Sequence, residues 1–237
     1  DKIIHQDTTY FRVFEPRIGL SGSRTSFFHN SVGGYHGAKP RRYEEIYNYS
    51  NEHKISGVMN MLNVKYFLYE ENGVLKTEEN ENALGNAWSV DSLISVSTPD
   101  QVLERMKTIN LNKSAIVIEN ELPDETNLSY KKDSSFSVKL NKISPEILAY
   151  DYISEYDQLV VFSEIYYPKG WNVSIDENKA THFPVNYILR GMVVPKGNHR
   201  IIFSFTPDKL KSGTIIRLFS LFVFIIVMVL IIFRRRK

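Results

Sequence analysis

The sequence predicts an α+β fold class, in which a small α/β layer is followed by an antiparallel β-sandwich and then by one C-terminal transmembrane helix. Three observations predict it. Residues 87–119 have the pattern of strand, helix and strand, residues 136–205 contain six short strands separated by turns, and residues 215–233 are almost wholly apolar. We therefore divide the chain into four regions: 1–123 (mixed α/β), 136–207 (β-sandwich), 213–233 (transmembrane helix) and 234–237 (basic tail).

The apolar run near the C-terminus has the length of a membrane span. Ile215–Phe233 holds 19 residues, which as a helix extend over about 28 Å, close to the hydrocarbon thickness of a bilayer. Arg217 is its one charged residue, and the long stem of an arginine reaches from the edge of the span to the headgroups. A buried helix of a soluble protein would instead show a polar stripe.

The basic tail gives the expected orientation. Arg234–Lys237 reads RRRK, and Lys and Arg beside a span prefer the cytoplasmic side. We expect the C-terminus to be cytoplasmic and residues 1–210 to be extracytoplasmic. The chain begins at Asp1 without an initiator Met or a signal peptide. We therefore expect it to be the downstream portion of a longer, multi-span membrane protein.

Composition excludes several function classes. The net charge is only +2, part of it in the terminal tail, so the sequence offers no basic stripe for nucleic acid. Cysteine is absent, which excludes disulfides, thiolate metal sites and cysteine nucleophiles. The six histidines show no metal-ligand spacing and no GxSxG element occurs, so we predict neither a metal site nor a hydrolase triad.

The region before residue 120 is predicted to contain several short elements followed by the α/β layer. Thr98 is placed to cap a helix with Pro99 at its first position, and Asp91–Ser92 is expected to kink the preceding strand. Pro40 is likewise expected at the first position of a helix. The expected strands are 9–15, 25–28, 64–69, 87–96 and 115–119, and the expected helices are 41–51, 57–62 and 100–109.

A polar, turn-like stretch at residues 124–135 is the expected domain boundary, after which short strands recur. Leu159, Val161, Phe203 and Phe205 are expected in the sandwich core. The expected strands are 136–142, 147–153, 158–165, 171–175, 187–194 and 199–205. The side chains expected to be solvated are Arg190, Lys196, Arg200, Glu155, Asp157, Glu164 and Asp176.

The glycine-rich stretch at residues 30–39, NSVGGYHGAK, is the least generic part of the chain. Its glycines permit backbone conformations closed to other residues and close approach to a ligand. Two interpretations stay open: a tight surface loop, whose Tyr35 and His36 pack on a neighbouring domain or the membrane interface, or a ligand-contacting loop. In the second, His36 and Lys39 are candidates to contact a phosphate. The candidate substrate-binding residues are Gly33, Gly34, Tyr35, His36 and Lys39.

Aromatic side chains between Tyr166 and Trp171 are the other candidates for binding. Tyr166, Tyr167 and Trp171 can stack on a sugar, whereas a Trp that opens a sandwich strand often fills the core instead. The sequence leaves both interpretations open.

The same segments carry a resemblance to a known family. Ser163–Asp176 (SEIYYPKGWNVSID) and Pro184–Pro207 (PVNYILRGMVVPKGNHRIIFSFTP) resemble the C-terminal signature of the YfhO family of bacterial membrane proteins. Upstream, VGGYHGAK at residues 32–39, Arg42–Tyr43 and MLNVKYF at residues 61–67 follow the family's usual order. Two departures are the inserted Lys169 and the lack of the many transmembrane helices that family members carry before this region.

The resemblance implies a GT-C-like glycosyltransferase in the cytoplasmic (inner) membrane of a bacterium, which uses a polyprenyl-phosphate sugar donor and acts on cell-envelope glycans. Its catalytic acid would lie in an early loop that this sequence does not contain, so the catalytic residues stay unknown. No cofactor is expected in the chain itself. Expected partners are the lipid bilayer, upstream transmembrane helices of the same protein and an envelope glycan.

Three functional hypotheses remain open. The chain is the accessory C-terminal region of a membrane glycosyltransferase, a membrane-anchored binding or scaffold module without catalytic activity, or the folded remnant of a split gene.

Overall fold

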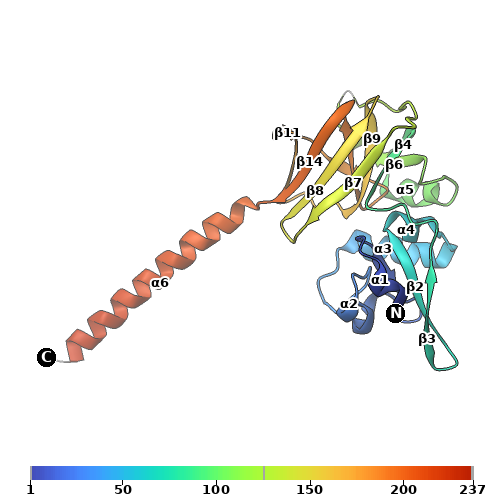
Figure 1. Cartoon of the computed structure of the whole chain (residues 1–237). Coiled ribbons are helices and arrows are strands. Elements are labelled where there is room, and N and C mark those ends of the chain that lie inside the picture. The colour runs from blue at the N-terminus through green and yellow to red at the C-terminus, as the bar shows by residue number, and fades with distance from the viewer. Residues whose placement is uncertain (1, 125, 236–237) are drawn as a thin grey trace.

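A computed structural model describes residues 2–124 and 126–235 of the chain (Figure 1). Within this part, four β-sheets and several short helices form a body from which one long helix, α6 (Asp208–Arg235), projects. Antiparallel strands dominate the body and the helices lie mainly in its N-terminal half. The predicted α+β class is confirmed.

The N-terminal part contains short helices and a three-stranded sheet. Strand β1 runs parallel to β2, and β2 forms an antiparallel hairpin with β3 through Asn72 and Gly73, both with positive φ. Pro40 precedes α3 as its N-cap and is not its first helical residue. The elements are α1 (Lys2–Gln6), β1 (Arg12–Phe14), η1 (Gly19–Ser21), α2 (Ser23–Phe28), α3 (Arg41–His53), α4 (Gly57–Met61), β2 (Val64–Glu71) and β3 (Val74–Glu79).

The predicted strand at residues 25–28 is wrong, because these residues form the end of helix α2. Thr25 faces inward, where its hydroxyl donates a 3.0 Å hydrogen bond to the carboxylate of the buried Glu15. The neighbouring Arg24 also pairs with Glu15. This tertiary anchor overrides the strand preference of Thr and Phe, which is a weak local effect.

The α/β layer is formed as predicted, and the kink at Asp91 splits its first strand between two sheets. Strand β4 joins the sandwich beside β9, whereas β5 pairs in parallel with β6. Thr98 caps α5 by accepting from the backbone N–H of Gln101 at 3.3 Å, with Pro99 at the first helical position. The elements are β4 (Ala87–Val90), β5 (Ser92–Val96), α5 (Pro99–Met106), β6 (Ser114–Ile118) and η2 (Glu119–Glu121).

The remaining strands build the sandwich from two antiparallel sheets, with strand orders β11-β10-β14-β8-β7 and β12-β13-β9-β4. All six strands expected here are present, and β11 and β12 are additional. Leu159, Val161 and Phe203 are buried as predicted, whereas Phe205 is only half-buried. The strands are β7 (Ser137–Ile143), β8 (Ile147–Ser154), β9 (Gln158–Ile165), β10 (Trp171–Ile175), β11 (Asn178–Ala180), β12 (Phe183–Val185), β13 (Leu189–Val194) and β14 (Gly197–Phe205).

One hydrophobic core extends across the expected domain boundary. It contains Val90 and Leu93 from before residues 124–135 together with Leu159 and Leu189 from after them. The boundary segment itself lies against β5, since the N–H of Leu93 donates to the carbonyl of Leu128 at 2.9 Å. The regions on the two sides therefore share a sheet and a core.

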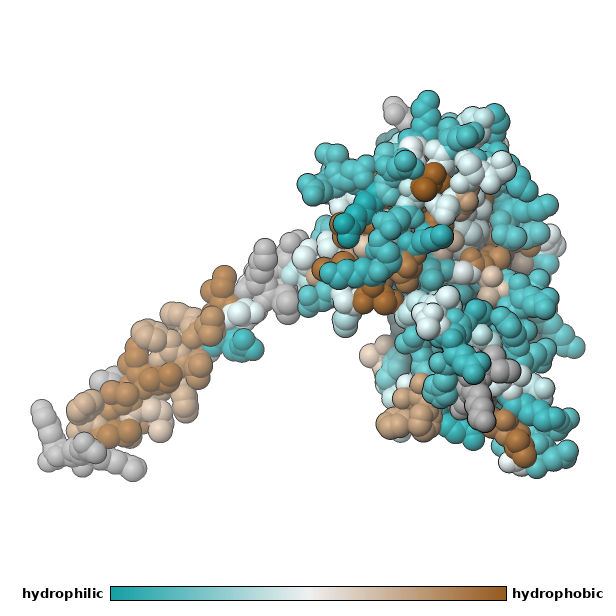
Figure 2. Space-filling view, viewed as in Figure 1, coloured by the Kyte–Doolittle hydropathy of each residue, from teal (hydrophilic) through white to brown (hydrophobic). Residues whose placement is uncertain are grey.

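Helix α6 contains the expected membrane span. Ser212–Arg234 is long and apolar enough to cross a bilayer, with a mean hydropathy of 3.1, and no part of it is buried against the body (Figures 1 and 2). Of the predicted basic tail, Arg236 and Lys237 lie outside the described residues. The cytoplasmic location of the tail stays a prediction.

Candidate functional site

A groove of about 650 Å³ lies where α3, η2 and the loops on either side of β10 and β11 meet. Apolar and aromatic side chains form most of its wall, with one arginine and one histidine among them. Its lining residues are Arg42, Asn120, Glu121, Leu122, Pro123, Tyr166, Pro168, Thr181, His182, Phe183 and Pro184.

A smaller hollow of about 220 Å³ adjoins this groove, because Arg42 and Tyr166 line both. Tyr43 and Tyr187 form part of its wall. Together the two cavities, which we call the aromatic groove, are lined by three tyrosines and by two arginines, Arg41 and Arg42.

Arg42 is held in the groove by two contacts. Its guanidinium lies 5.5 Å from the ring centre of Tyr187 and 3.2 Å from a carboxylate oxygen of Glu121. Both members of the ion pair are partly exposed, so the pair is weak and a ligand anion can replace Glu121. The groove therefore offers a cation beside an aromatic surface.

Tyr187 makes a second contact with helix α3, which also carries Arg42. Its hydroxyl donates a 2.7 Å hydrogen bond to Glu45. Burial and this bond raise the pKa of Tyr187 to about 12, and the same bond lowers the pKa of Glu45. The tyrosine therefore stays neutral and the carboxylate charged across the physiological range.

His182 supplies a neutral imidazole to the groove wall. Its ring lies between Tyr166 and Phe203, with ring centres 5.2 and 5.4 Å away. Burial, with a smaller contribution from Arg190, lowers its pKa below the ordinary value, so the ring is uncharged at neutral pH. Its Nδ1 is buried and has no partner among the described residues.

Arg190 lies behind this wall, and the expectation that it is solvated is wrong. It is 2% exposed, its guanidinium lies 4.2 Å from the ring centre of Trp171, and its Nε donates to the carbonyl of Ile165 at 3.1 Å. Trp171 is half-buried between Arg190 and Phe205. This arrangement favours the core role of Trp171 over stacking on a sugar.

Glu164 was also expected to be solvated, and it is instead a partly buried ion-pair partner. Arg12 lies 2.9 Å from its carboxylate and donates to the carbonyls of Leu62 and Ser163 at 2.9 and 2.7 Å. This arginine joins the N-terminal part to strand β9. A structural role accounts for all three contacts.

None of residues 30–39 lines the aromatic groove, although the hydroxyl of Tyr43 donates a 2.7 Å hydrogen bond to the carbonyl of Val32. Gly33 packs against η1 so closely that a Cβ there would lie 2.9 Å from the carbonyl oxygen of Gly19, and the N–H of Gly34 donates to the carbonyl of Leu20 at 3.0 Å. Tyr35 and His36 are exposed and Lys39 is partly exposed. Backbone packing thus accounts for Gly33 and Gly34, and substrate binding by this loop stays a prediction.

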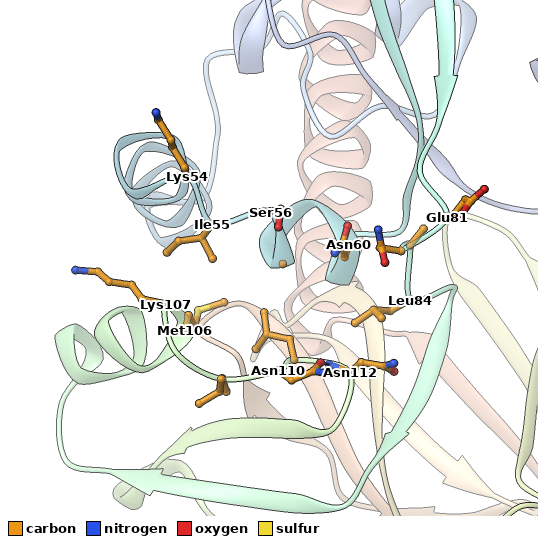
Figure 3. Close-up of a pocket in the computed structure, with 15 residues that line it drawn as sticks. Lys54, Ile55, Ser56, Asn60, Glu81, Leu84, Met106, Lys107, Asn110 and Asn112 are labelled. Carbon is orange, nitrogen blue, oxygen red and sulfur yellow. Dashed lines mark hydrogen bonds between the residues drawn. The ribbon is translucent and has the colours of Figure 1, made fainter.

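A second cleft, of about 610 Å³, lies between the helices α3 and α4 and the loop before β6 (Figure 3). Its wall is polar and contains several asparagines, of which Asn60 and Asn110 already accept hydrogen bonds from neighbouring turn residues. It offers no aromatic platform. Among the described residues, no three His, Asp or Glu side chains are placed to hold a metal ion.

A match to a known protein family covers part of the aromatic groove. Residues 101–217 match the model of a family described as bacterial membrane protein YfhO. By this match, residues 101–217 belong to the YfhO family. The match includes Tyr166, His182 and Tyr187, whereas Arg42 and the glycine-rich loop lie before it. Neither the curated proteins nor the solved structures gave a match.

The sequence indicates some residues of the aromatic groove but not that these residues lie close together. Tyr166 was a candidate for sugar stacking, and Arg42–Tyr43 belonged to the YfhO resemblance. His182 and Glu121 were not singled out, because single polar residues beside β12 and β6 have no recognisable spacing. The order of the YfhO motifs is the one signal in the sequence that indicates that residues of the groove wall come together.

Proposed function

We propose that this YfhO-family chain is the extracytoplasmic C-terminal part of a GT-C-like membrane glycosyltransferase. The enzyme would use a polyprenyl-phosphate-linked sugar and act on cell-envelope glycans at the outer face of the bacterial cytoplasmic membrane. The observation that supports this proposal is the aromatic groove, in which Tyr166 and Tyr187 from the family match face Arg42.

The groove suits the binding of an anionic glycan. Sugar rings stack their apolar faces on aromatic side chains, and Tyr166 offers such a surface beside the apolar Pro168. Arg42 can pair with a phosphate or carboxylate of the polymer by two parallel hydrogen bonds.

The groove is better suited to binding than to bond formation. Of the described residues that line it, Glu121 alone carries a carboxylate, and that group pairs with Arg42. We therefore assign the chain the positioning of the glycan and leave the chemical step to another part of the enzyme. The same feature favours the second candidate, a membrane-anchored scaffold module that binds a glycan without any catalytic activity.

The test uses two adjacent tyrosines. Tyr166 lines the groove, whereas Tyr167 does not line it and is half exposed. In membranes from the producing bacterium, we expect Tyr166→Ala to lower glycan transfer about 2- to 12-fold, since a contact with one aromatic ring contributes about 0.5–1.5 kcal/mol. Tyr167→Ala should leave it unchanged. Equal transfer by the two variants would exclude the groove as the acceptor site.

A binding measurement separates the two candidate functions. Purified chain in nanodiscs is titrated with isolated envelope polymer, and Tyr166→Ala should weaken binding in both cases. If the variant loses binding while transfer from a polyprenyl-phosphate-linked sugar continues at the wild-type rate, the glycosyltransferase role fails and the scaffold role stands.

A further inference from the structure

Three aromatic side chains form an exposed patch on the N-terminal part of the body. Phe27 and Phe28 of α2 are 81% and 65% exposed, and Tyr35 of the following loop is 85% exposed. The two phenylalanine rings contact each other edge to face, with centres 4.9 Å apart. Elsewhere in the described part of the body, exposed large apolar residues are scattered singly.

The fold holds this patch outward. On α2, Thr25 is buried and hydrogen-bonds to Glu15, so the helix is anchored to the body at this residue, while the side chains of Phe27 and Phe28 stay largely exposed. The loop lies beside the helix, because a Cβ at Gly34 would lie 3.6 Å from the hydroxyl of Ser26. Tyr35 therefore follows directly from a point in contact with α2.

The patch lies on the side of the body toward which the membrane helix runs. In Figure 1, α6 leaves the sandwich and passes the side of the body on which α2 lies. Figure 2 shows apolar residues over α2 on that same side. A bilayer crossed by α6 therefore extends toward α2, whereas the β2–β3 hairpin lies at the edge of the body farther from α6.

We infer that Phe27, Phe28 and Tyr35 dock the body onto the headgroup region of the bilayer that α6 crosses. Aromatic side chains are favoured at this depth, because their apolar rings enter the acyl boundary while a tyrosine hydroxyl stays in contact with water. The half-exposed guanidinium of Arg24, on the same helix, is placed to meet anionic lipid headgroups. The body is thereby held at two points, by α6 and by the patch.

Because the chain contains no cysteine, a single introduced cysteine is its only site for a thiol-reactive label. This permits a site-specific test. Ser26→Cys places an environment-sensitive fluorophore on exposed α2 and keeps both phenylalanines. Val74→Cys, 60% exposed on the β2–β3 hairpin, is the matched control. The whole chain is reconstituted in vesicles of phosphatidylcholine and phosphatidylglycerol, with or without lipid that carries a quencher near the headgroup.

We expect quenching lipid to lower the emission of the Ser26 label at least about two-fold, as for a group at the interface, and to leave the Val74 label unchanged. Adding Phe27→Ser and Phe28→Ser to Ser26→Cys should abolish the quenching, and an unchanged melting temperature shows that the fold is intact. An unquenched label with water-like emission overturns the inference. A blue-shifted but unquenched label also overturns it, because the patch then packs against protein, such as a second copy.

Discussion

His199 shows how a single motif residue fixes a turn. Its Nδ1 lies 2.6 Å from a carboxylate oxygen of Asp176, and its Nε2 lies 3.1 Å from the carbonyl oxygen of Lys196. The ring also covers Gly197, where a Cβ would lie 2.8 Å from Nε2 and where φ is +132°. The run PKGNH at residues 195–199, part of the segment that resembles the YfhO family, therefore has a structural explanation, in which histidine and glycine together close the β13–β14 hairpin.

This pair predicts a pH dependence of stability. The hydrogen bond to Asp176 raises the pKa of His199 above its ordinary value, and bonds from Arg200 and His199 lower the pKa of Asp176. The histidine contribution is thus complete below pH 6.5 and is lost as the pH rises through the folded-state pKa. The aspartate contribution is lost only in acid, as the pH falls through its lowered pKa.

We therefore expect His199→Gln to destabilise the chain more at pH 6 than at pH 9. Urea unfolding in detergent micelles, followed by tryptophan fluorescence, gives the difference in free energy of unfolding from the wild type at each pH. The same difference at both values would mean that the imidazolium does not stabilise the fold.

Arg190 and Glu164 show why residue-level predictions of exposure fail. Both were expected to be solvated because charged residues rarely lie in a core. In the structure Arg190 instead covers Trp171 and bonds to the carbonyl of Ile165, while Glu164 meets Arg12 from a segment about 150 residues away in sequence. These partners come from distant parts of the chain, so no local sequence pattern predicts the contacts.

Asn186 connects two elements that are far apart in sequence. It is fully buried, its N–H donates to the carbonyl of Ile116 at 2.8 Å, and its Oδ1 accepts from the N–H of Ile116 at 2.9 Å. Its φ is +49°, a left-handed conformation that asparagine tolerates better than most residues. This one side chain joins strand β6 of the α/β layer to the β12–β13 hairpin of the sandwich.

We expect Asn186→Ala to lower the free energy of unfolding by about 3 kcal/mol, because it leaves a buried N–H unsatisfied and places alanine at positive φ. Asn178→Ala is the control. Asn178 is exposed, and its side chain bonds only to a turn carbonyl, so the cost should stay below about 0.5 kcal/mol. Comparable losses in the two variants would show that the link to β6 does not stabilise the fold.

Elements with local signals could be predicted from the sequence. Thr98 and Pro99 predict the start of α5, and alternating apolar residues predict the six strands between 136 and 205. Helix α2 could not be predicted, because its cause is the contact of Thr25 with Glu15. The aromatic groove could not be predicted either, since its wall combines residues between 40 and 188 that meet only after the sheets have formed.

At the scale of the molecule, the body is held together across the predicted domain boundary. Strand β4 pairs with β9, and Trp88 of β4 donates to the carbonyl of Leu111 at 3.0 Å while packing in the shared core. Arg12 and Asn186 add two polar links between the same halves. Separation of the halves would expose one side of the largest apolar cluster and leave β4 without its partner.

This arrangement predicts that the body unfolds as one unit. A protease site inserted between residues 124 and 127 allows the folded chain to be cut in detergent micelles without breaking a strand. We expect the two fragments to stay associated on gel filtration and to unfold in a single urea transition, because the shared core stabilises both halves. Residues 1–123 expressed alone should remain unfolded, since Trp88 and its neighbours would then lie in water. Two separate transitions, or a folded 1–123 fragment, would instead establish the region before residue 124 as an independent domain, and the contacts of β4 with β9 would then be a docking interface between two domains.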